Sequence, residues 1–242
     1  MIPTILHAGL FNYNEVGSDS NLDLLKQEIL ENSTKFPNSS FSNDGCWRGT
    51  QQLHNIKFLL EAIETSVKEQ FKYYSDIDNT FAMYSNQQFD IHYWANVNNI
   101  GSRNVMHAHK PGIFSGCYYI QGEGTGNLRI VNPANILGEC NPRSPFSRDF
   151  FFTPKDRDLI MWPSWLPHEV EPNLSNNDRI NIAFDVRFKN EMNETSFMID
   201  SSEGPYNTGR KYENGNMGHR PGVKGGYFPV PPIDSAQDMR GE

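Results

Sequence analysis

Two histidines lie one residue apart in the segment MHAHKPG, which spans residues 106–112. The chain has only seven histidines, so the close spacing of His107 and His109 stands out. In a β-strand, side chains at positions i and i+2 project to the same face of the sheet. If the segment is a strand, the two imidazoles provide half of a metal site, and a further ligand must come from elsewhere in the chain.

The best candidate for the third ligand is His168, in the segment WPSWLPHEVEPN. It follows the apolar run LIMW and a turn in which Pro163 and Pro167 restrict the backbone, which would hold the ligand in place. Three neutral imidazoles suit zinc or iron and leave coordination positions open for water or substrate. We therefore predict a metal site formed by His107, His109 and His168. The other four histidines are expected to be structural: His7, His54, His92 and His219.

An arginine follows His168 by eleven residues, in the segment DRINIAF. If this segment is a strand, its isoleucines face one side, and Arg179 and Asn181 face the other. An arginine that points inward is costly unless it meets an anion, and its planar guanidinium suits a carboxylate. A metal site with such an arginine behind it suits a ligand with two anionic ends. The alternative is that Arg179 forms a structural ion pair with Asp158 or Asp178.

The hydrophobic period indicates which elements position these residues. Residues 1–86 are expected to be helical with irregular links, with Ser20 as the cap of a first helix and apolar residues at helical spacing over 56–71 in a second. From about residue 88 the period changes to two. We predict about seven strands with short turns and one long insertion near 134–153, and hence a mainly β fold, either a barrel or a sandwich. The strands include FDIHYWANV, GIFSGCYYIQG, GNLRIVNP, RDLIMWP and DRINIAFDVRF.

The last part of the chain, residues 189–242, has a different composition. It is polar, rich in glycine, proline and asparagine, and shows no clear period. We expect an irregular C-terminal extension that either wraps the β part or is partly disordered. Residues 1–188 are then expected to form a single domain, with a helical part over 1–86 and a β-barrel over 87–188.

The composition excludes several functional classes. The chain has 242 residues, of which 37% are hydrophobic, which is enough for one all-β domain with a sizeable core. The net charge of −8 argues against a sequence-independent grip on nucleic acid, which needs a basic surface. The three cysteines, Cys46, Cys117 and Cys140, suit a reducing compartment rather than a disulfide scaffold. No apolar run is long enough to span a bilayer and no signal peptide is expected, so we predict a cytoplasmic location, in the host cell if the protein is viral.

The order of these segments resembles that of the 2-oxoglutarate/Fe(II) oxygenases: an HxH pair, then SGCYYI, then the distal PHEVEPN and a downstream arginine. More closely, WANVNNIG, HAHKPGIFSGCYYI, LIMWPSWLPHEVEPN and RINIAF resemble a family of these oxygenases found in bacteria and their phages. The segment SNDGCWRGTQQLH is similar to the N-terminal part of that family. The resemblance covers residues 40–188, and the motifs are fairly specific as a set.

The resemblance implies a double-stranded β-helix with Fe(II) at the open end of the barrel and 2-oxoglutarate as cosubstrate. In the wider superfamily, the iron ligands are a His-x-Asp/Glu pair and a distal histidine. His107 would then be the first histidine and His168 the distal one. His109 stands where the carboxylate normally stands, so three neutral ligands would leave the site with the full charge of the metal ion.

Further roles follow from the resemblance to prolyl-hydroxylase-like members. Tyr119 matches a tyrosine whose hydroxyl binds the distal carboxylate of 2-oxoglutarate beside the arginine, here Arg179. Asn181 matches the polar residue two positions after that arginine, and Asn96 is a further candidate for the same cosubstrate. Tyr119 could instead be a core residue, and Asn96 could merely satisfy a backbone turn. No catalytic residue is predicted beyond the metal ligands.

Three functions remain open, and we favour the first. It is an Fe(II)/2-oxoglutarate-dependent dioxygenase that uses O₂ to hydroxylate an organic substrate while 2-oxoglutarate is decarboxylated to succinate. The second is a three-histidine metalloenzyme that does not use 2-oxoglutarate, with zinc that activates water or with iron as in cupin thiol oxidisers. The third is a non-catalytic binding barrel. The sequence does not identify the substrate, and it leaves the oligomeric state open, a homodimer included.

Overall fold

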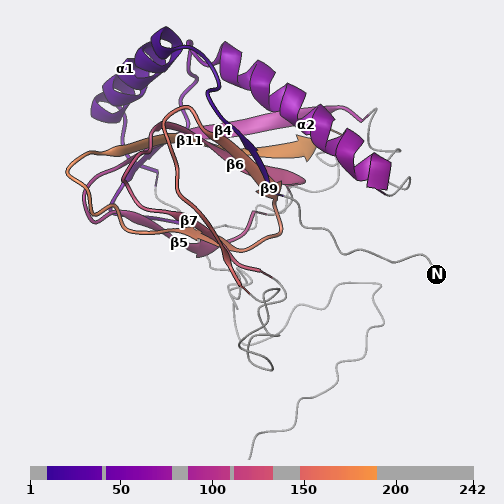
Figure 1. Cartoon of the computed structure of the whole chain (residues 1–242). Helices are drawn as coiled ribbons and strands as arrows, with labels where there is room; N and C mark the ends of the chain where they lie inside the picture. The colour runs from indigo at the N-terminus through magenta and orange to yellow at the C-terminus, as the bar shows by residue number, and fades with distance from the viewer. Residues whose placement is uncertain (1–9, 40–41, 78–86, 110–111, 133–147, 190–242) are drawn as a thin grey trace, which may run out of the picture. The chain divides into compact units, whose positions relative to one another are not determined.

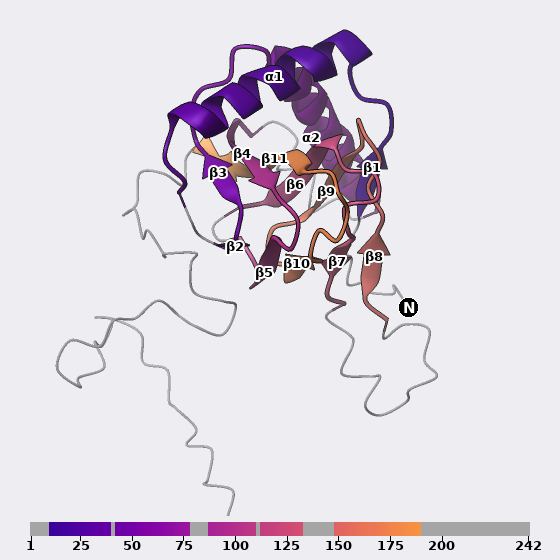
Figure 2. The ribbon, with the colours of Figure 1, turned by 90° about the vertical axis from the view of Figure 1, so that its left-hand side faces the viewer.

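The described part of the chain forms two antiparallel sheets and two helices (Figures 1 and 2). The computed structural model describes residues 10–39, 42–77, 87–109, 112–132 and 148–189, all of which lie in one unit of the chain. The elements in chain order are β1 (Phe11–Tyr13), α1 (Asp19–Lys35), β2 (Asn43–Asp44), β3 (Trp47–Gly49), α2 (Lys57–Ile77), β4 (Phe89–Asn98), β5 (Arg103–His107), β6 (Phe114–Gln121), β7 (Leu128–Ile130), β8 (Phe150–Phe152), β9 (Leu159–Pro163), β10 (His168–Val170) and β11 (Arg179–Phe188).

The larger sheet has six strands in the order β1-β9-β6-β11-β4-β3, and the smaller has five in the order β2-β5-β10-β7-β8. The predicted mainly β fold is confirmed, but the strands of the described residues do not close into a barrel. The edge strands β1, β3, β2 and β8 are only two or three residues long, and each pairs on one side alone. The two sheets therefore form a sandwich that is open between its edges.

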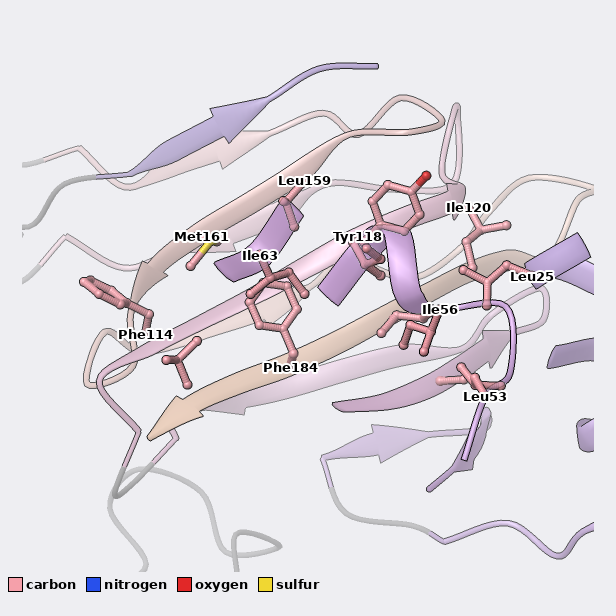
Figure 3. Packing of buried hydrophobic residues seen from close by; sticks show 14 of the residues in the cluster. Leu25, Leu53, Ile56, Ile63, Phe114, Tyr118, Ile120, Leu159, Met161 and Phe184 are labelled. Atoms are coloured by element: carbon pink, nitrogen blue, oxygen red, sulfur yellow. The ribbon is translucent and has the colours of Figure 1, made fainter. Parts of the chain in front are cut away.

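Strict alternation divides each long strand of the larger sheet between two environments. In β6, Phe114, Tyr118 and Ile120 point to the helix side, and in β11 Ile182 and Phe184 do the same. With residues of α1 and α2 they form one buried cluster, because both helices cover the outer face of this sheet (Figures 1 and 3). The other half of each strand consequently points into the space between the sheets.

A second, smaller cluster lies between the sheets. It contains Cys117, Tyr119, Ile160 and Trp162 from the larger sheet, together with Leu128 and Ile130 of β7 and further apolar residues nearby. Most inward positions near one end of β4 and along β11 are polar instead. Their buried side chains are Asn96, Asn98, Arg179, Asn181 and Asp185. Polar groups buried between two sheets need partners, so this region is the natural place for a site.

Several expectations about individual elements need correction. Helix α1 is capped by Ser18, not by Ser20: the Ser18 hydroxyl accepts from the Asn21 backbone N–H at 3.3 Å, and the Asn21 side chain accepts from the Ser18 N–H at 3.1 Å. Ser18 has the extended backbone of an N-cap residue, whereas Ser20 lies within the helix.

The N-terminal part also contains more β structure than expected. Besides the two helices, residues 10–77 include the strands β1, β2 and β3. The described residues between 88 and 188 contain eight strands rather than about seven, and β8 lies inside the expected insertion of 134–153. The strands β1, β2, β3 and β8 are two or three residues long, too short for their period to be visible in the sequence. Residues 134–147 of the insertion and nearly all of the predicted C-terminal extension lie outside the described residues.

Candidate metal centre

The three predicted metal ligands lie together between the sheets. His107 is the last residue of β5 and His168 the first of β10, and the two are direct partners in the antiparallel ladder. His109 lies two residues beyond the end of β5, where its backbone N–H donates to the Ser164 carbonyl at 3.0 Å. One ligand atom from each histidine lies within 4.8 Å of the other two. His107 and His109 were expected on one face of a strand. In the structure His107 ends β5 and His109 lies in the turn that follows it.

Hydrogen bonds at Nδ1 orient all three rings. His107 Nδ1 is 2.7 Å from the Val105 carbonyl, and His168 Nδ1 is 3.0 Å from the Leu166 carbonyl. Because a carbonyl only accepts, Nδ1 of both rings carries the proton, which leaves the lone pair on Nε2. His109 Nδ1 contacts the carboxylate of Asp185 instead. Metal-binding histidines are usually held with the proton on the nitrogen that faces away from the metal, so the three rings fit a metal ion bound through Nε2.

Burial keeps the ring nitrogens in the state that metals bind. Burial, with a smaller contribution from neighbouring His109, lowers the pKa of His107 to about 3. Burial also holds the pKa of His168 well below its ordinary value, with His107 and His109 adding to the effect. Both histidines are therefore neutral at physiological pH, and neutral imidazole is the form that ligates a metal.

Aromatic side chains surround the cluster, and the sequence analysis did not identify them as part of the site. The Trp94 ring stacks on His109 with centroids 5.5 Å apart, and the Trp162 ring meets His168 edge-on at 4.8 Å. The Arg48 guanidinium lies 4.7 Å from the centroid of the Trp94 ring. Trp94 and Asn96 are two positions apart in β4 and therefore share a face. The period-two alternation could thus have predicted that Trp94 points toward the site.

Arg179 is fully buried at the start of β11. Its Nη1 donates to the carbonyls of Thr125 at 2.6 Å and Glu171 at 3.1 Å, while its Nε and Nη2 have no hydrogen-bond partner within the described part of the chain. Within the same residues it forms no ion pair with Asp158 or Asp178. Two unpartnered donors on a buried guanidinium suit a carboxylate that binds both. The donor set therefore fits the anionic end of a cosubstrate.

The other predicted cosubstrate residues lie next to one another across neighbouring strands. Asn181 of β11 is the partner of Tyr119 in β6 and of Asn96 in β4. The Asn96 side-chain amide donates to Asn181 Oδ1 at 2.8 Å, and it accepts from the Asn43 amide at 3.0 Å. Burial raises the pKa of Tyr119 well above its ordinary value, so its hydroxyl keeps its proton and can donate.

One buried residue of the site was missed altogether. Asp185 Oδ1 lies 2.5 Å from His109 Nδ1 and also accepts from the Ser115 hydroxyl at 2.8 Å. Asp185 lies on the inward face of β11, six residues after Arg179. The alternation of the strand placed it on the same face as Arg179, but no sequence pattern indicated that it would meet His109.

Comparison with curated proteins finds short similarities to glutamine synthetases. The chain is 64% identical over 58 residues to the enzyme from Azospirillum brasilense, a match that covers 24% of this chain and 12% of that protein. It is 61% identical over 123 residues to the enzyme from Vibrio alginolyticus, which covers 49% of this chain and 24% of that protein. The chain therefore spans only a small part of the length of these relatives.

Two solved structures share the fold. A prolyl-4-hydroxylase from Pseudomonas putida matches with a TM-score of 0.52 and 14% identity, over 75% of this chain and 94% of that one. SnoK, a non-heme alpha-ketoglutarate dependent carbocyclase from nogalamycin biosynthesis, matches with a TM-score of 0.51 and 9% identity, over 74% of this chain and 79% of that one. The two facing sheets are thus a double-stranded β-helix, as the resemblance implied.

A family model matches the central part of the chain. The model described as "Putative 2OG-Fe(II) oxygenase" matches residues 92–185, from the middle of β4 to Asp185 of β11. The matched part contains the three clustered histidines and Arg179. Residues 92–185 are therefore similar to this family of 2-oxoglutarate/Fe(II) oxygenases.

Proposed function

We propose that the protein is an Fe(II)- and 2-oxoglutarate-dependent dioxygenase that hydroxylates an organic substrate. One observation carries the proposal: a buried three-histidine cluster and a buried arginine with two unpartnered donors lie between the sheets of an oxygenase fold. When bound, iron with 2-oxoglutarate supplies the oxidation of a C–H bond by O₂, with hydroxylated substrate, succinate and carbon dioxide as products. The protein supplies the ligands, their geometry and a dry site.

The histidines hold the metal through their Nε2 atoms. Because each Nδ1 is already engaged by a carbonyl or a carboxylate, the rings of His107, His109 and His168 are oriented before the ion arrives. Such preorganisation avoids the cost of ordering the ligands on binding. Trp94 and Trp162 pack against two of these rings and limit the access of water from their side.

The cosubstrate is held along β11. Arg179 binds the distal carboxylate of 2-oxoglutarate with Nε and Nη2, and the protonated hydroxyl of Tyr119 donates to the same carboxylate. Asn181 and Asn96 lie on the path from Arg179 to the histidines, because Asn181 shares the inward face of β11 with both Arg179 and Asp185. The order of these residues along the strand supports a cosubstrate that bridges the arginine and the metal.

A second candidate function is a three-histidine metalloenzyme that does not use 2-oxoglutarate, with zinc or a cupin-type iron. It is favoured by one observation: the metal-ligand cluster of the described residues contains three imidazoles and no carboxylate. In this case Arg179 would bind an anionic group of the substrate itself.

Location and partners are part of the proposal as well. The described residues contain no helix that is both long and apolar enough to cross a membrane. Cys46 and Cys117 are buried free thiols, which supports a reducing compartment, and we propose the cytoplasm. The net charge of −8 supports an organic substrate other than a nucleic acid backbone.

Anaerobic titration of the Fe(II)-loaded protein with 2-oxoglutarate tests this proposal. Chelation of iron by a 2-oxo acid produces a weak visible charge-transfer band, which we expect in the wild type and at much higher 2-oxoglutarate concentration in Arg179→Ala. Arg103→Ala is the matched control, since Arg103 is an exposed arginine that pairs with Asp44. Iron binding without the band would favour the second candidate, and a protein that bound neither iron nor zinc would reject both.

A further inference from the structure

Asp185 is a buried carboxylate that the proposed mechanism does not yet use. Its side chain is only 5% exposed. Oδ1 contacts His109 Nδ1 at 2.5 Å and the Ser115 hydroxyl at 2.8 Å, and Oδ2 accepts from Arg187 Nη2 at 3.3 Å. The Ser115 hydroxyl and the Arg187 guanidinium both donate to this carboxyl group, and such hydrogen bonds stabilise its ionised form. The contacts of Asp185 are therefore those of a carboxylate anion.

The contact distinguishes His109 from the other two ligands. The Nδ1 atoms of His107 and His168 each bond the backbone carbonyl two residues earlier, which is a neutral partner in the same stretch of chain. His109 lies beyond the end of β5 and bonds the charged side chain of a distant strand instead. The one imidazole that stands in the place of a carboxylate ligand is thus the one that carries a carboxylate behind it.

The net charge of the ligand set explains why a carboxylate next to His109 matters. A divalent ion held by three neutral imidazoles keeps its full charge, whereas a carboxylate ligand removes one unit. A carboxylate that accepts the Nδ1 proton of a ligating histidine fixes its tautomer and makes Nε2 a stronger donor. Asp185 would provide that negative charge through its contact with His109.

We propose that Asp185 is a positioning residue that acts through His109: it holds the imidazole with Nε2 toward the metal and restores the negative charge that the ligand set lacks. The inference rests on the proposed metal centre, but not on the use of 2-oxoglutarate. Ser115 holds the carboxylate in place, and Arg187 moderates its charge from the other oxygen.

The test is titration of the metal-free protein with Co(II), followed by its visible spectrum. Asp185→Asn keeps the size of the side chain and an oxygen acceptor but removes the charge. We expect a loss of about 10- to 100-fold in Co(II) affinity, the usual effect of removing such a partner. Ser115→Ala is the matched control, because it removes one hydrogen bond from the same carboxylate and leaves the charge, so a much smaller loss is expected.

A double-variant cycle separates the charge from a merely structural role. In His109→Asp the new carboxylate faces Asp185, and the two like charges repel each other. Adding Asp185→Asn to His109→Asp should therefore raise Co(II) affinity, although the same change lowers it in the wild type. A role in folding alone would lower affinity in both backgrounds, and that result would overturn the proposal.

Arg187→Gln provides a test that does not disturb a fully buried residue, since 28% of the Arg187 side chain is exposed. Removing this counter-charge should raise Co(II) affinity by up to about fivefold, and a decrease would contradict the proposal. If the wild type binds Co(II) but 2-oxoglutarate does not bind, the oxygenase proposal fails while this inference stands. If the wild type binds no Co(II), the inference fails with the metal centre.

Discussion

His107 and His168 lie directly opposite each other in the β5–β10 ladder, with ring centroids 4.3 Å apart. The two imidazoles are close enough to bind one metal ion, although they are 61 positions apart in the sequence. The pairing of the strands therefore sets the distance between the two ligands, and the third ligand needs only the turn after β5. Replacing either histidine should lower metal affinity more than it lowers the stability of the fold.

Replacing one ladder histidine should abolish metal binding. His168→Ala removes a buried ligand from the centre of the cluster, and we expect Fe(II) or Co(II) affinity to fall by more than about 100-fold, beyond the loss seen for outer partners. Metal content after dialysis and Co(II) titration measure the effect. His54→Ala is the control, since His54 is exposed and outside the cluster. Equal metal retention in the two variants would contradict the three-histidine assignment.

Two adjacent tyrosines allow a matched test of the cosubstrate pocket. Tyr119→Phe removes a hydroxyl that points between the sheets, and we expect 2-oxoglutarate affinity to fall by about tenfold, because a hydrogen bond to a charged group contributes about 1.5–3 kcal/mol. The midpoint of the visible-band titration measures this change.

Tyr118→Phe is the control for that prediction. Tyr118 points to the opposite side of β6, and its hydroxyl donates to the Val16 carbonyl at 2.8 Å. Its loss should lower the free energy of unfolding by about 1 kcal/mol and leave 2-oxoglutarate affinity unchanged. If both variants changed the titration midpoint equally, Tyr119 would be a core residue rather than a cosubstrate ligand.

Acid should destabilise the metal-free protein over a defined pH range. The pKa of His107 is lowered to about 3 in the folded state and that of His168 lies well below its ordinary value, whereas both titrate near 6.5 when unfolded. Below about pH 6.5 the unfolded chain therefore binds more protons, and the free energy of unfolding falls as the pH is lowered toward 3. Each histidine contributes at most about 1.4 kcal/mol per pH unit.

Urea denaturation in the presence of a chelator, at about pH 7 and about pH 5, measures this dependence. The double variant His107→Gln/His168→Gln lacks both titrating groups and should show a weaker dependence on pH in this range. A wild-type protein whose stability did not change between the two pH values would show that the histidines are accessible to protons in the folded state.

Gly116, in the SGCYYI segment, should not tolerate a side chain. A Cβ at this position would overlap the Phe184 ring and lie 2.7 Å from the Ile160 carbonyl oxygen. We expect Gly116→Ala to lower the free energy of unfolding by about 1–3 kcal/mol, as overpacking of a core does. Thermal or urea denaturation measures the loss.

The partner of that clash supplies the control. Phe184→Leu alone leaves a space and should also destabilise the protein, but it removes the ring that Gly116→Ala would meet. The two changes together should therefore cost less than the sum of the single changes. Strict additivity would show that the backbone contact with Ile160, rather than the Phe184 ring, excludes the side chain.

Period-two alternation allowed much of the fold to be predicted from the sequence. It identified the long strands β4, β6 and β11, and it separated Ile182 from the inward Arg179 and Asn181, because neighbouring side chains of a strand must point to opposite faces. The helices were recognised by their own period, although the cap of α1 was misplaced by two residues. Short strands such as β2 and β10 were not visible, since two or three residues show no period.

What the sequence determined by itself is the set of residue types on each face: three histidines that can ligate a metal, and an arginine on an inward strand position. Only the tertiary structure decided which of them meet. Strand pairing placed His168 against His107, and the packing of one sheet on the other brought Asp185 of β11 to His109. Such contacts depend on register and on the distance between sheets, which are set by the whole chain and not by local spacing.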